Sequence, residues 1–133
     1  MWIFVVLSIS IGLGGLFCYN RFLFRQGESR FPPTGRFVSA EGIKLHYISK
    51  GSGKPIVFLH GGVLTGSDFE QVLNMAADKG YQAIAFDRPG YGYSERPRNE
   101  PVTPIVQARL IHAALVELGI EKPILVGHSW SGM

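Results

Sequence analysis

Three short, uninterrupted apolar runs constrain the fold of this sequence more than any other feature. They are PIVFLH (55–60), YQAIAFD (81–87) and KPILVG (122–127), and a helical pattern lies in each gap between them, over residues 67–79 and 103–118. Apolar runs of this length without alternation are typical of strands that are buried on both faces, as in parallel sheets. The order of strands and helices therefore predicts an α/β domain, with helices on both faces of a mostly parallel sheet.

Two further strand patterns precede these runs. Arg36–Ala40 and Ile43–Ser49 are separated by Glu41-Gly42, and a two-residue loop of this kind predicts a β-hairpin. Together with the three apolar runs, this hairpin places the α/β domain over residues 36–133.

The composition excludes several classes of site and partner. Cys18 is the only cysteine, which excludes a disulfide framework and a zinc site built from paired cysteines. The 13 Lys and Arg residues exceed the 10 Asp and Glu residues by only three, so nucleic acid is not expected as a partner. No group of ligand side chains stands out in the sequence, and we expect neither a metal nor an organic cofactor.

The first 19 residues, Met1–Tyr19, contain no charged side chain. As a helix they would extend about 28 Å, which is close to the ~30 Å hydrocarbon core of a membrane. Trp2 and Tyr19 lie near the two ends, where aromatic rings favour the membrane–water interface. The pattern predicts a single-pass transmembrane anchor over residues 1–20, followed by a linker over residues 21–35.

Two alternatives for the N-terminal segment remain open. A cleaved secretory signal would carry a basic start and small residues at its cleavage site, but Leu16-Phe17-Cys18 is bulky. A core or interfacial helix is the other alternative. For a membrane anchor, the positive-inside rule favours a cytosolic location of the following residues, because four arginines lie after the span: Arg21, Arg25, Arg30 and Arg36.

The last apolar run leads directly into Gly127-His128-Ser129-Trp130-Ser131-Gly132. A sharp turn from strand to helix lifts its central side chain above the sheet, and it needs small residues two positions before and after that side chain. Gly127 and Ser131 occupy these positions, so the pattern is G-x-S-x-S and Ser129 is a candidate nucleophile. The alternative is a turn rich in glycine and serine in which Ser129 only caps a helix.

Two more loops follow apolar runs. A glycine loop such as His60-Gly61-Gly62 can aim a backbone N–H group at a developing oxyanion, and the amide of Trp130 can supply a second donor. The loop DRPGYGYS (87–94) predicts a type II turn at Pro89-Gly90 and a carboxylate, Asp87, that accepts backbone N–H groups.

In this order and spacing, HGG, DRPGYGYS and GHSWSG resemble the α/β-hydrolase fold superfamily over residues 36–133. The resemblance implies that Ser129 is the nucleophile, that Gly62 and Trp130 supply the oxyanion amides, and that His60 orients its loop. Relatives with aspartate at the nucleophile position are dehalogenases and epoxide hydrolases. Serine favours an ester, lactone or similar small acyl substrate.

In this fold the catalytic triad follows the order Ser, acid, His. Only four residues follow Ser129 in the sequence, and all four histidines precede or adjoin it: His46, His60, His112 and His128. We expect His128 to be packed within its turn and His112 to be a surface or packing residue. The sequence is thus expected to be an N-terminal piece of a longer hydrolase, or a truncated product, that has no turnover by itself.

Two other functions remain open. One is a membrane-anchored, non-catalytic scaffold of the same fold that binds a partner or a small ligand. The other is a peptidase, because the Ser129-Trp130 pair is similar to that of proline iminopeptidases. The oligomeric state is not predicted.

Overall fold

The computed structural model describes residues 2–132. The chain divides into two compact units, Met1–Pro33 and Thr34–Met133, which are described separately.

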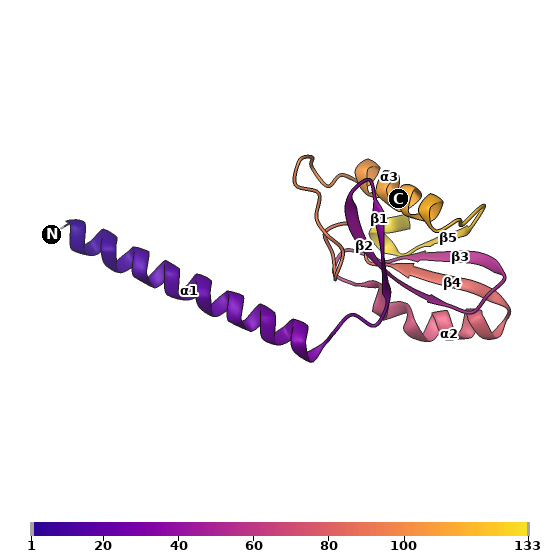
Figure 1. Ribbon diagram of the computed structural model, residues 1–133, viewed down its shortest axis with the longest axis horizontal. Coiled ribbons are helices and arrows are strands. Elements are labelled where there is room, and N and C mark those ends of the chain that lie inside the picture. Colours follow the sequence, from indigo (N-terminus) through magenta and orange to yellow (C-terminus); the bar gives the residue numbers. More distant parts are fainter. Residues whose placement is uncertain (1, 133) are drawn as a thin grey trace. The chain divides into compact units, whose positions relative to one another are not determined.

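The first unit is the helix α1, Trp2–Arg30, which is long and apolar enough to cross a membrane (Figure 1). It continues ten residues beyond the predicted anchor, so residues 21–30 of the predicted linker are helical. Nothing in that stretch breaks a helix strongly, whereas Pro32-Pro33 disfavours helical backbone in the residue before it. Within the predicted linker, only residues 31–35 are non-helical.

The second unit contains a five-stranded sheet with the order β1-β2-β4-β3-β5. The three apolar runs form its parallel part, because β3 pairs in parallel with both β4 and β5. The hairpin strands are antiparallel, β1 to β2 and β2 to β4, so the sheet is mixed. The strands are β1 (Arg36–Ala40), β2 (Ile43–Lys50), β3 (Lys54–Leu59), β4 (Tyr81–Phe86) and β5 (Ile124–Gly127).

The turn of the hairpin explains its tight register. Glu41 and Gly42 have φ angles of +52° and +80°, the signs required by a type I′ turn. Ala40 and Ile43 are therefore paired directly, and the predicted hairpin is confirmed.

Two helices, α2 (Glu70–Asp78) and α3 (Pro104–Glu117), cover opposite faces of the sheet, as predicted (Figure 1). Alternate residues of β4 face opposite sides. Ile84 and Phe86 belong to the apolar cluster that contains Leu110 of α3, whereas Ala83 and Ala85 cluster with Leu73 of α2. The short 3-10 helix η1 (Gly66–Phe69) leads into α2. Because β3, β4 and β5 run in one direction, the loops that follow these strands lie at the same end of the sheet.

Candidate active site

Ser129 lies two residues after the end of β5 and has a φ angle of +54°. Few residues other than glycine adopt this left-handed conformation, and such strain occurs most often at functional sites. The turn is too tight for a side chain at Gly127, where an added Cβ would collide with the carbonyl oxygen of Ser131. Ser129 itself is exposed at the start of the 3-10 helix η2, Ser129–Gly132. We call residues 127–131 the serine turn.

Ser131 lies two residues after Ser129, where the G-x-S-x-G pattern has its second glycine. Its Oγ donates a hydrogen bond to the carbonyl oxygen of His60 at 2.6 Å. The hydroxyl therefore ties the serine turn to residues 60–62, which we call the HGG loop.

The HGG loop lies against the serine turn. The N–H of His128 donates to the carbonyl oxygen of Leu59 at 3.0 Å, which extends the pairing of β3 with β5. A Cβ added at Gly61 would lie 3.2 Å from the Cβ of Ser129. Gly62 is exposed and has open space around it. The structure thus brings together the two predicted loops, with Gly62 on the open side.

His60 is fully buried and both of its ring nitrogens are engaged. Its Nε2 accepts a hydrogen bond from the backbone N–H of Arg88 at 3.0 Å, so its Nδ1 carries the proton and donates to the carbonyl oxygen of Gly61 at 2.8 Å. Burial lowers the pKa of His60, and the positive charge of Arg88 lowers it further. His60 is therefore a neutral connection between loops with no nitrogen available to act as a base.

The other histidines differ in their environments. His112 is exposed on α3, in agreement with its prediction as a surface residue. His128 is also exposed, with its Nδ1 3.1 Å from the Cβ that would be added at Gly61. The prediction that His128 packs within the turn is wrong, because the residue is exposed to solvent.

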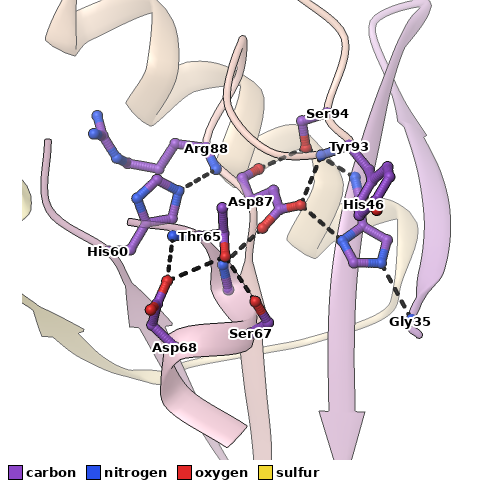
Figure 2. A network of polar contacts seen from close by, with 11 residues as sticks. Gly35, His46, His60, Thr65, Ser67, Asp68, Asp87, Arg88, Tyr93 and Ser94 are labelled. Atoms are coloured by element: carbon purple, nitrogen blue, oxygen red, sulfur yellow. Dashed lines mark hydrogen bonds and ion pairs between the residues drawn. The ribbon is translucent and has the colours of Figure 1, made fainter. Parts of the chain in front are cut away.

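Asp87 accepts hydrogen bonds from three segments of the chain (Figure 2). Its Oδ1 accepts from the N–H of Gly66 at 2.6 Å, and its Oδ2 accepts from the N–H of Tyr93 and from Nδ1 of His46, each at 2.9 Å. Burial raises the pKa of Asp87, but these hydrogen bonds outweigh burial and hold the pKa below its ordinary value. The prediction that Asp87 accepts backbone N–H groups is confirmed.

Sequence reasoning missed the role of His46. His46 lies between the apolar residues Leu45 and Tyr47 of β2, so in an alternating strand it would face away from them, yet it is only 3% exposed. Its Nε2 accepts from the N–H of Gly35 at 3.2 Å, which leaves the proton of Nδ1 for Asp87 (Figure 2). The two side chains are 41 residues apart, and no local signal links them.

The turn after Asp87 is the predicted type II turn. The N–H of Tyr91 donates to the carbonyl oxygen of Arg88 at 2.9 Å, with Pro89 in the second position and Gly90 at a φ angle of +83°. The turn leaves Arg88 2% exposed beside the HGG loop. Arg88 is the second residue whose importance the sequence analysis missed.

Comparisons with known proteins agree with this geometry. A family model described as alpha/beta hydrolase fold matches residues 54–133. An epoxide hydrolase from Caballeronia sordidicola is 35% identical over 94 residues, which are 70% of this chain and 29% of the relative. A non-heme chloroperoxidase from Kitasatospora aureofaciens is 32% identical over 102 residues, which are 71% of this chain and 34% of the relative.

A solved structure gives the same result. The crystal structure of an epoxide hydrolase from Vigna radiata superimposes with a TM-score of 0.69 and 33% sequence identity, over 73% of this chain and 32% of that one. The chain thus spans about a third of the length of the relatives that it matches.

The lowered pKa of His60 predicts a pH dependence of stability. Above about pH 6.5, the ordinary value, His60 is neutral in both the folded and the unfolded state. Below it the unfolded state takes up the proton first, so the free energy of unfolding falls until the pH passes the lower folded pKa. We expect His60→Asn to reduce this fall, measured by urea unfolding in detergent between about pH 7.5 and 5.5.

The matched control is His112→Asn, because His112 is exposed. Its fall in stability should equal that of the wild type. If the free energy of unfolding falls as much in the His60→Asn variant as in the wild type, His60 is not the cause of the pH dependence.

Proposed function

The chain belongs to the alpha/beta hydrolase fold family, and on this premise we propose that Ser129 is the nucleophile of a hydrolase that acts on an ester, lactone or similar small acyl compound. One observation carries the proposal. Ser129 is exposed in a left-handed conformation two residues after the end of β5, and the HGG loop lies against it. A serine held in this way presents its hydroxyl to a substrate above the sheet.

The proposed reaction has two halves. In the first, Oγ of Ser129 attacks the carbonyl carbon of the substrate, a base takes the hydroxyl proton, and the carbonyl oxygen becomes an oxyanion. The N–H groups of Gly62 and Trp130 donate to this oxyanion, and one such donor is worth about 3–4 kcal/mol in the transition state. The alcohol leaves with the proton, and water then hydrolyses the acyl–serine ester by the same steps.

Serine chemistry argues for an acyl substrate rather than an epoxide. A carboxylate that opens an epoxide forms an ester, which water can hydrolyse. The hydroxyl of Ser129 would instead form an ether, which is stable to this hydrolysis. The likeness to epoxide hydrolases therefore supports the shared fold, and the nucleophile decides between the substrate classes.

We propose that the acid and the base of the triad come from polypeptide beyond residue 133. His60 is fully engaged, and His46 is bound to Asp87. An apolar groove of about 530 Å³ lies between α3 and β5, and Leu125 at its edge is 61% exposed. Further strands and helices of a longer chain would cover this surface. Residues 1–133 alone would then show no turnover.

We also propose that α1 anchors the protein in a membrane as a single span. Its apolar side chains are exposed along its length, and its charged residues are confined to the last ten positions. The arginines Arg21, Arg25 and Arg30 all lie in that last part, which favours the cytosolic side for the catalytic unit.

Labelling with a fluorophosphonate tests the nucleophile. We expect membranes from the native source to contain a labelled protein well above 14.7 kDa, the mass of this chain, with the label on the peptide that contains Ser129. Ser129→Ala should abolish labelling, because the reagent needs an activated hydroxyl, whereas Ser52→Ala in an exposed turn should not. An unlabelled species at the chain mass would instead favour a non-catalytic scaffold.

The role of the Gly62 N–H group can be tested by substitution with proline, which has no backbone N–H. Gly62→Pro eliminates the N–H group, and in the complete protein, as the cell makes it, we expect kcat for a p-nitrophenyl ester to fall by about 10²- to 10³-fold. Gly62→Ala is the matched control, since it keeps the N–H group and its Cβ would meet nothing within 4 Å. Equal activities of the two variants would exclude this amide from the site.

Extraction at alkaline pH tests the anchor. We expect the full chain to remain in the membrane pellet after carbonate washing and a variant that lacks residues 2–20 to be released, because the deletion removes the uncharged segment. Release of both proteins would exclude a membrane span.

A further inference from the structure

Arg88 is a buried cation that the proposed reaction does not use. It follows Asp87 at the end of β4 and is only 2% exposed. Within residues 2–132 its guanidinium has no carboxylate partner, and its Nε has no hydrogen-bond partner. Burial of an uncompensated charge is costly, which makes the contacts that do hold Arg88 informative.

Four groups hold the guanidinium in place. Its Nη1 donates to Oε1 of Gln107 on α3 at 2.7 Å, and its Nη2 donates to the carbonyl oxygen of Gly61 at 2.8 Å. Its Cζ lies 4.3 Å from the ring centroid of Tyr91 and 4.3 Å from that of Trp130. A planar guanidinium can donate from its edge while it stacks on aromatic rings, which a lysine ammonium cannot do.

The contact with Gly61 controls the direction of the Gly62 amide. The carbonyl group of Gly61 and the N–H group of Gly62 belong to one planar trans peptide, so the two point in opposite directions. The carbonyl oxygen accepts from Nη2 of Arg88 and from Nδ1 of His60, each at 2.8 Å. These two donors fix the orientation of the peptide and polarise it, which strengthens its N–H group as a donor.

The contact with Trp130 acts on the other donor. The residue after Ser129 supplies the second N–H group of the proposed oxyanion site. The guanidinium stacks on the ring of Trp130 and so restrains the residue that carries this group.

We propose that Arg88 is a positioning residue that holds both donors of the oxyanion site at once, through the carbonyl group of Gly61 and the ring of Trp130. The inference rests on the proposed function, because it takes the N–H groups of Gly62 and Trp130 as the oxyanion donors. The unpaired positive charge of Arg88 also favours negative charge at the nearby reacting oxygen.

Kinetics of the complete protein, as the cell makes it, provide the first test. Arg88→Lys keeps the positive charge but removes the planar guanidinium, which donates to Gly61 and Gln107 and stacks on Tyr91 and Trp130. We expect kcat for a p-nitrophenyl ester to fall about 10- to 100-fold while KM changes less than about two-fold, since only the transition state carries the oxyanion. In the Gly62→Pro background the same change should cost much less, because one of the two donors is already absent.

Arg98→Lys is the matched control, because Arg98 is an exposed arginine in the same segment between β4 and α3. It should leave kcat unchanged. If Arg88→Lys leaves kcat unchanged like this control, Arg88 does not position the donors. The same conclusion follows if the decrease in kcat of the double variant is the product of the decreases of Arg88→Lys and Gly62→Pro.

A second readout needs no turnover. In protein labelled with ¹⁵N-glycine, the Gly62 resonance is identified by its loss in Gly62→Ala. We expect its amide proton to move upfield in Arg88→Lys and not in Arg98→Lys, because the peptide loses the polarising donor. If Arg88→Lys fails to fold, Gln107→Leu releases one arm of Arg88 and should shift the resonance in the same direction.

The two readouts separate the two proposals. If the wild-type protein neither hydrolyses esters nor takes the fluorophosphonate label at Ser129, the proposed function fails. The Gly62 resonance then decides the role of Arg88 alone: an upfield shift supports it as a positioning residue, and an unchanged resonance overturns it.

Discussion

The loops of the candidate site depend on one buried carboxylate. Asp87 is 2% exposed, and its two oxygens accept from His46 on β2, from Gly66 before α2 and from Tyr93 in its own loop. A buried charge is tolerated only when hydrogen bonds replace water. Without Asp87, the N–H of Gly66 and Nδ1 of His46 would be left buried without this acceptor, at a cost of about 1–3 kcal/mol for each donor.

Hydrogen bonds connect the residue after Asp87 to the serine turn. The N–H of the next residue, Arg88, donates to His60, and the carbonyl oxygen of His60 accepts from the hydroxyl of Ser131. A short series of hydrogen bonds thus joins the ends of β4, β3 and β5. The nucleophile candidate lies at the end of this series, in a strained conformation that the surrounding contacts maintain.

Much of the fold could be predicted because its signals are local. A strand buried on both faces must be apolar throughout, so the three parallel strands are visible in the sequence. The turns at Glu41-Gly42 and Pro89-Gly90 were predictable because their positive φ angles favour glycine. The extent of α1 was missed, since charged residues end an apolar segment but do not end a helix.

The sequence by itself determined the α/β class, the long apolar helix, and the places of the serine turn and the HGG loop, because each depends on residues that are close along the chain. Only the tertiary structure decided that His46 binds Asp87 and that Arg88 reaches Gly61, Gln107 and Trp130. These partners lie 19 to 42 residues apart. The local sequence around a residue does not show which distant residue it contacts, because only the packing of the strands and helices brings the two residues together.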